Sequence, residues 1–89
     1  MFRIWGKIFL QNHLLKDTVV ENASNLTRTR KVFDGLEEIC HRFDLSVPIW
    51  LDSNIRDFKR ISKTRFTKDS FIEPIEFDYL EIQVIEEDV

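Results

Sequence analysis

The feature that most constrains the fold is an apolar stripe between residues 26 and 43, with spacings of three and four positions. Its members are Leu26, Thr29, Phe33, Leu36, Cys40 and Phe43, widened by Val32 and Ile39. The residues expected on the wet side are Arg28, Lys31, Asp34, Glu38 and Arg42. This spacing is typical of an amphipathic α-helix that buries one face. Because Ser24 or Asn25 can cap the first turn, the sequence predicts a long helix that begins near these residues.

The segment before this helix predicts a β-hairpin. Residues 2–10 alternate between two faces, with Trp5 and Phe9 on the face opposite Ile4. Residues 14–21 contain two adjacent valines and form the second strand. The sequence therefore places a two-stranded sheet next to the helix.

Both glycines fall where another part of the chain can come close. Gly6 lies within the first strand, where it either thins the strand or admits a neighbouring backbone. Gly35 lies at the edge of the helical stripe, where it costs about 1 kcal/mol relative to alanine. A close approach between helix and sheet explains that position.

The second half of the chain predicts a short helix and a final strand. Residues 47–51 are apolar but contain a proline, so any strand there is short or at an edge. A helix capped by Asp52 or Ser53 runs to about residue 62, and a loop follows through residue 69. The strand at 75–85 changes phase near its middle, which indicates either a bulge near residues 79–80 or burial on both faces.

These elements predict an α+β fold whose final strand joins the hairpin in a small antiparallel or mixed sheet. The helix residues expected to face the sheet are Phe33, Leu36, Ile39, Cys40 and Phe43. Their expected partners are Ile4, Ile8, Leu80, Ile82 and Val84. In the short helix, Ile55, Phe58 and Ile61 share the expected buried face.

The length and cysteine count restrict the class of protein. Residues 1–89 are enough for one small domain, since a second could not build its own core. A single cysteine excludes an internal disulfide. No signal peptide and no run of about 20 apolar residues is visible, so we expect no membrane insertion and a cytoplasmic location.

Charge is sorted along the sequence although the net charge is only −3. Residues 56–68 carry six basic side chains and one interior acid: Arg56, Lys59, Arg60, Lys63, Arg65 and Lys68, with Asp57. Residues 73–88 carry seven acids and no base: Glu73, Glu76, Asp78, Glu81, Glu86, Glu87 and Asp88. This pattern predicts one basic and one acidic surface, an arrangement suited to binding or self-association.

The stretches Arg3-Ile4-Trp5-Gly6-Lys7, Pro48-Ile49-Trp50-Leu51-Asp52-Ser53-Asn54 and Phe77-Asp78-Tyr79-Leu80-Glu81-Ile82 carry a resemblance. They resemble those of short uncharacterised proteins of clostridial-type bacteria, over nearly the whole chain. The resemblance implies a bacterial, cytoplasmic protein and supplies no activity or functional residue.

No motif in the chain predicts catalysis, a metal or a cofactor. Cys40 and His41 are neighbours that point about 100° apart on a helix, so they cannot pair as thiolate and imidazole. Asp52 follows an apolar segment as catalytic acids often do, but a helix cap is the simpler interpretation. One cysteine and two histidines provide no paired zinc-ligand spacing. We therefore expect no catalytic residue, no metal ligand and no cofactor.

The sequence predicts a small non-catalytic module that binds another protein or a second copy of itself, as in a homodimer. The six basic residues are the candidate binding face. Trp5 and Phe9 are a candidate aromatic patch, which is either exposed or covered if helices pack on both sides of the sheet. The alternative is a nucleic-acid-binding protein that uses the basic face of the second helix, against which the overall acidity argues.

Overall fold

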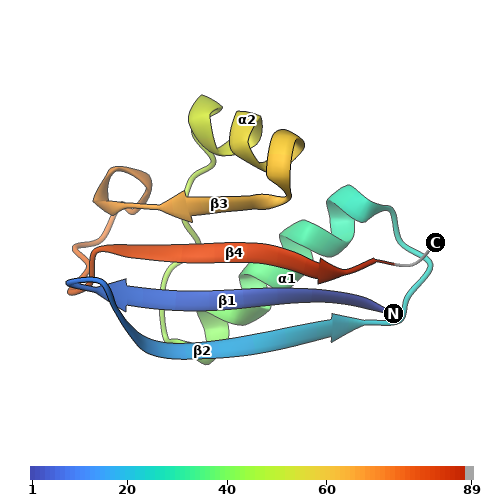
Figure 1. Ribbon diagram of the computed structural model, residues 1–89, viewed down its shortest axis with the longest axis horizontal. Helices are drawn as coiled ribbons and strands as arrows, with labels where there is room; N and C mark the ends of the chain where they lie inside the picture. The colour runs from blue at the N-terminus through green and yellow to red at the C-terminus, as the bar shows by residue number, and fades with distance from the viewer. Residues whose placement is uncertain (88–89) are drawn as a thin grey trace.

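A computed structural model of the chain describes residues 1–87 and shows an α+β fold (Figure 1). The elements in order are β1 (Phe2–Leu10), β2 (His13–Asn22), α1 (Arg28–Arg42), α2 (Asp52–Ile61), β3 (Lys63–Phe66), the 3₁₀-helix η1 (Lys68–Ser70) and β4 (Tyr79–Glu86). The four strands form an antiparallel sheet in the order β2-β1-β4-β3. In Figure 1, α1 lies behind the sheet and α2 lies alongside β3.

The predicted hairpin is confirmed, and its first strand has the expected bounds. Gln11 and Asn12 form the turn with φ values of 51° and 66°. Two consecutive left-handed residues fit the twist of a two-residue hairpin loop, and asparagine tolerates that conformation well. One shift in register, between Ile8 and Phe9, bends the hairpin near this turn.

The long helix is also confirmed, but it begins later than predicted. Thr27 is the N-cap, and its Oγ1 accepts a hydrogen bond of 3.2 Å from the Arg30 amide. Leu26 therefore lies outside the helix and is exposed, whereas Lys31, predicted on the wet side, is buried. Phe33, predicted to face the sheet, is 47% exposed.

One hydrophobic core lies between α1 and the sheet and extends under α2. Its buried apolar members are Phe2, Ile4, Ile8, Val20, Val32, Leu36, Ile39, Cys40, Phe43, Phe58, Phe66, Phe71, Leu80 and Ile82. Most of the predicted helix–sheet contacts are thus confirmed. Phe33 is the exception because Val32 and Leu36, not Phe33, point at the centre of the sheet.

Two glycines allow α1 to approach β1 closely. A Cβ atom at Gly35 would lie 2.6 Å from Ile4 Cγ2, and one at Gly6 would lie 2.5 Å from Ile39 Cγ2. Both distances are far inside van der Waals contact, so each glycine receives the side chain of an isoleucine from the facing element. The predicted close approach of helix and sheet is confirmed at Gly35, whereas the space at Gly6 is filled by the Ile39 side chain and not by a neighbouring backbone.

We expect the Gly35→Ala substitution to destabilise the fold. Alanine would improve helix propensity by about 1 kcal/mol, but overpacking against Ile4 costs about 1–3 kcal/mol. Urea unfolding of the variant measures the net loss. In the double variant Gly35→Ala/Ile4→Leu the branched Cβ is gone, so part of the stability should return. A Gly35→Ala variant more stable than the wild type would contradict this packing.

The second half of the chain departs from the prediction in three places. Residues 63–66 form β3, where a loop was expected, because Ser62 adopts a left-handed conformation (φ 55°) that ends α2 and starts an extended segment. The final strand begins at Tyr79, and no bulge lies at residues 79–80. Leu80, Glu81 and Ile82 are buried in succession and β4 lies between β1 and β3, which agrees with the alternative of a strand buried on both faces. Residues 47–51 form no regular strand.

The short helix α2 is confirmed, with two corrections. Asp52 lies in its first turn, while the side chain of Asn54 accepts a hydrogen bond of 2.9 Å from the Leu51 amide. Of the three apolar residues predicted to be buried, only Phe58 is; Ile55 and Ile61 are exposed. The helix lies at the edge of the sheet and covers less of it than α1 does (Figure 1).

Candidate functional site

The six basic residues predicted as one binding face are divided among three elements. Those on α2 are Arg56, Lys59 and Arg60; those on β3 are Lys63 and Arg65; Lys68 lies in η1. The helix ends at Ile61, and the side chains of the following strand alternate with a period of two. The residues after the helix, expected in a loop, thus lie on a strand and in a 3₁₀-helix, and the six basic residues do not share one helical face.

Two of these cations are already paired with carboxylates. Arg60 lies 3.8 Å from Asp57, and Arg65 lies 3.3 Å from Glu81. This pairing reduces the positive field that a phosphate backbone would meet. The nucleic-acid alternative stays a prediction. Asp88, which was counted with the acids, lies outside the described residues.

Trp5 and Phe9 lie on the face of the sheet opposite α1, called the open face below. In strand order its side chains are Asp17 and Val19 of β2, Arg3, Trp5, Lys7 and Phe9 of β1, Tyr79, Glu81 and Gln83 of β4, and Lys63 and Arg65 of β3. No described helix covers this face (Figure 1). The two aromatic residues are half-buried, with Lys7 between them in β1, and their role as a binding patch stays a prediction.

A network of polar and aromatic contacts crosses the open face. Lys7 Nζ lies 3.1 Å from Glu81 Oε2 and 3.8 Å from the centroid of the Trp5 ring. Trp5 Nε1 donates a 2.8 Å hydrogen bond to Asp17, which extends the network to β2. Arg65 joins it to β3 through Glu81. These contacts link side chains from all four strands, with the buried ion pair of Lys7 and Glu81 among them.

The ion pair shifts the pKa of Glu81. Burial alone would raise the pKa of this carboxyl, but the hydrogen bond and charge of Lys7, with Arg65 and Lys63, lower it below the usual 4.5. The folded chain therefore binds this proton less readily than the unfolded chain. The stabilisation is present above the unfolded-state pKa and is lost as pH falls through the lower folded-state pKa.

We expect the free energy of unfolding to depend on pH differently in the wild type and in the Glu81→Gln variant. Urea unfolding at pH 7, 5, 4 and 3 gives the free energy of unfolding of both proteins. Their difference should be largest at pH 7 and pH 5 and should shrink towards pH 3, because glutamine does not titrate. A constant difference over this range would show that the carboxylate is not stabilised by Lys7.

Cys40 is a core residue. Its side chain is fully buried, and burial raises its pKa to about 12. The thiol is therefore protonated at neutral pH, and the thiolate is the form that acts as a nucleophile. His41 and Asp52 are both exposed, on α1 and α2 respectively.

Residues 1–87 contain neither a metal-binding cluster nor a membrane-spanning helix. No cluster of three or more histidine, cysteine, aspartate or glutamate side chains in this range is arranged to hold a metal ion. None of the helices in it has the length and apolar character needed to span a membrane.

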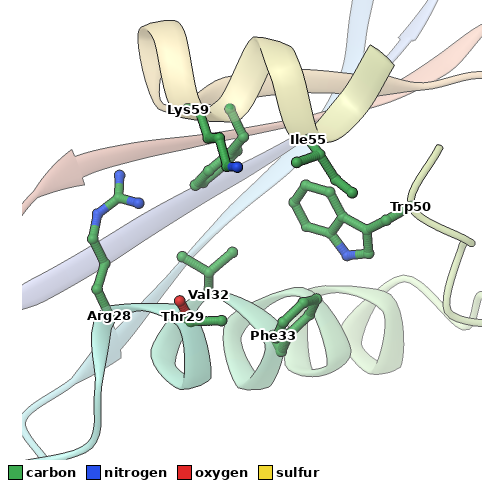
Figure 2. A pocket seen from close by; sticks show the side chains of 8 residues that line it. Arg28, Thr29, Val32, Phe33, Trp50, Ile55 and Lys59 are labelled. Carbon is green, nitrogen blue, oxygen red and sulfur yellow. The ribbon is translucent and has the colours of Figure 1, made fainter. Parts of the chain in front are cut away.

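The strongest candidate site is an apolar groove between α1 and α2, called the α1–α2 groove (Figure 2). Its lining residues are Arg28, Thr29, Val32, Phe33, Trp50, Ile55, Phe58 and Lys59. Helix α1 supplies one wall and α2 the other, with Trp50 from the connecting segment between them. The apolar stripe of α1 is wider than the part of it that packs on the sheet, and the remaining part forms a wall of the groove.

Trp50 is held rigidly by three aromatic rings. It meets Phe33, Phe58 and Phe66 edge to face, with centroid distances of 5.7, 5.5 and 5.1 Å. Its buried Nε1 has no hydrogen-bond partner within residues 1–87, and Figure 2 shows that nitrogen on the side of the ring that faces α1. Such packing fixes the end of the groove in one shape before any partner arrives.

The groove leaves large apolar side chains exposed to water. Phe33 is 47% exposed and Ile55 is 42% exposed, on opposite walls. The segment that carries Trp50 also exposes Ile49 and Leu51. Exposed large apolar side chains on both walls of a groove are typical of sites that contact another molecule.

The charged residues of the groove are both cations. Arg28 donates a 2.9 Å hydrogen bond to Ser62 and forms an ion pair with Glu87. Lys59 is exposed, and no carboxylate of residues 1–87 lies within ion-pair distance of it. The groove therefore offers an apolar floor with a positive charge at its rim.

The groove volume restricts what it can hold. Its volume of about 200 Å³ is below the roughly 300–1,000 Å³ of pockets that enclose small-molecule ligands. A single large side chain anchored in such a pocket is, in contrast, the usual centre of a protein–protein contact. The geometry suits an anchoring side chain of a protein partner.

The prediction from sequence named only one groove residue, Lys59, as a site residue. Phe33 and Ile55 were assigned to the core because their helical spacing matched that of buried neighbours. The signal that could have identified the groove is the width of the stripe on α1, which includes adjacent apolar residues at positions 32 and 33 and again at 39 and 40.

Comparison with protein-family models, curated proteins and solved structures found no significant match for this chain. The resemblance to clostridial proteins stays a prediction.

Proposed function

We propose that this protein is a non-catalytic protein-binding module and that the α1–α2 groove is its binding site. The observation that carries the proposal is the exposure of Phe33 and Ile55 on facing walls above a rigid Trp50. Complete burial of one such side chain contributes about 1.5–3 kcal/mol, and roughly half of that is still to be gained at Phe33 and Ile55. The exposed apolar surface of these two residues is what supports binding at the groove.

The partner's chemistry follows from the groove. An apolar anchor side chain fills the floor, and an adjacent carboxylate meets Lys59 at the rim. Charge pairs at a rim steer association and orient the partner more than they add affinity. The expected ligand is a protein segment in which a large apolar residue stands next to aspartate or glutamate.

Selection of peptides from a random library tests this proposal. Binders are selected on the wild type, and their affinities are then measured for the wild type, Ile55→Ser and Leu15→Ser by fluorescence anisotropy. Leu15 is a matched control because it is 53% exposed but lies on β2, away from the groove. We expect binders rich in an apolar residue beside an acid, with at least about tenfold weaker binding to Ile55→Ser only.

Two results would refute the proposed function. One is a selection that yields no peptide whose affinity depends on Ile55. The other is a set of binders affected equally by both substitutions, which would place the contact outside the groove. Circular dichroism of each variant establishes that the fold is intact before binding is compared.

A further inference from the structure

The described surface carries a segment with the features that the α1–α2 groove requires of a ligand. Ile72 is 86% exposed, the most exposed of the large apolar side chains between residues 1 and 87. Glu73 follows it directly and is also exposed, as is Glu76. An apolar residue next to an acid, projecting into water, matches a groove with an apolar floor and a cation at its rim.

The loop that carries Ile72 is fixed at both ends. On one side, the Ser70 carbonyl accepts a 2.8 Å hydrogen bond from the Ile49 amide. On the other side, the rings of Phe71 and Phe77 pack edge to face at 5.9 Å, and Asp78 accepts a 2.8 Å hydrogen bond from the Gln11 amide. Ile72 is therefore presented in a preorganised loop, which reduces the entropy lost on binding.

We propose that Ile72 of one copy enters the α1–α2 groove of a second copy, with Glu73 placed beside Lys59. This inference rests on the proposed function and names a second copy of the chain as the partner. Because Ile72 is so exposed, it does not occupy the groove of its own chain. The contact joins a loop on one copy to a groove on another. If each of two copies places its loop in the groove of the other, they form a symmetric dimer; if each binds a different copy, they form an open chain.

The strength of this contact is limited by its size. One loop and one groove bury less surface than the roughly 1,200–2,000 Å² of stable interfaces, so association is weak. Sedimentation velocity between about 1 µM and about 1 mM covers the affinities expected for such contacts. The wild type should shift from monomer to a larger species within this range, and the shift should weaken as salt screens the Glu73–Lys59 contact.

Substitutions on both sides of the contact test its residues. Ile72→Ser and Ile55→Ser should each weaken association at least about tenfold, while Leu14→Ser, at a 47% exposed position of β2 outside the groove and the loop, should leave it unchanged. Ile72 and Ile55 are both exposed, so serine at these positions should leave the fold intact, which thermal unfolding verifies. Association of Ile72→Ser equal to that of the wild type would overturn the inference.

A charge exchange identifies the pairing. Lys59→Glu and Glu73→Lys should each reduce self-association, because like charges then meet at the rim. An equimolar mixture of the two variants should associate about as well as the wild type, since every Glu–Lys contact between unlike copies is attractive again. Failure of the mixture to recover association would refute the Glu73–Lys59 pairing.

The peptide selection separates the two proposals. A wild type that stays monomeric up to about 1 mM, together with groove-dependent peptide binding, would overturn self-association and leave the protein-binding function intact. Failure of both experiments would overturn both proposals.

Discussion

Replacing Leu36 with alanine is expected to lower the free energy of unfolding by about 2–5 kcal/mol. Leu36 is 1% exposed and lies on the face of α1 that packs on the sheet. The substitution removes buried methyl groups and leaves a cavity that the close helix–sheet contact cannot easily collapse. For a domain of this size the loss is a large fraction of the total stability.

The matched control for this prediction is Leu15→Ala, the same chemical change at an exposed position of β2. Its effect should lie within about 0.5 kcal/mol of the wild type. Urea or thermal unfolding of both variants provides the comparison. A loss below about 1 kcal/mol for Leu36→Ala would mean that this residue does not belong to the core.

The second large effect is expected for Lys7→Met, which leaves Glu81 buried without its closest cation. A fully stranded buried charge costs about 3–5 kcal/mol, but Arg65 remains 3.3 Å from the carboxylate. We therefore expect a loss of about 2–3 kcal/mol at pH 7. The same substitution at the exposed Lys68 should change stability by less than about 0.5 kcal/mol.

A double substitution separates a stranded charge from lost packing. In Lys7→Met/Glu81→Leu the buried charge is gone, so much of the stability lost in Lys7→Met should return. If the double variant is less stable than Lys7→Met, the loss comes from packing around the methylene chain of the lysine and not from the carboxylate.

The elements predicted correctly are those whose local pattern agrees with their final environment. β1 has the expected bounds because its alternation matches one core face and one open face. Helix α1 was predicted from the helical spacing of its apolar stripe, and in the structure this stripe packs on the sheet. For both elements, the local sequence and the tertiary contacts favour the same structure.

β3 was missed because it has four residues and follows a helix with similar charges. The basic residues of α2 and β3 form a continuous series in the sequence, and only the left-handed Ser62 separates their periodicities. Serine rarely adopts a positive φ, so the sequence does not indicate that residue 62 has this conformation. The structure distributes the six basic residues over α2, β3 and η1, and their role as a binding face stays a prediction.

The groove could not be predicted because exposure depends on where α2 lies. Phe33 and Ile55 have the spacing of buried residues, and each would be buried if the two helices packed together closely. In the structure α2 lies beside β3, which leaves the helices apart above Trp50. Periodicity identifies an apolar side chain and does not indicate which molecule will cover it.

The position of β4 in the sheet has a consequence for synthesis of the chain. β4 pairs with both β1 and β3, although it follows them by more than ten residues in the sequence. During translation, the hairpin, both helices and β3 emerge from the ribosome before β4, which lies between β1 and β3 in the sheet. One edge of β1 therefore has no hydrogen-bonding partner until residue 86 has left the ribosome. Folding of the sheet therefore cannot be completed from the N-terminus onwards. A ribosome that stalls before Tyr79 would leave a nascent chain in which this edge of β1 is unpaired. Such an edge can form hydrogen bonds with a strand of another chain, which leads to aggregation unless a chaperone binds it.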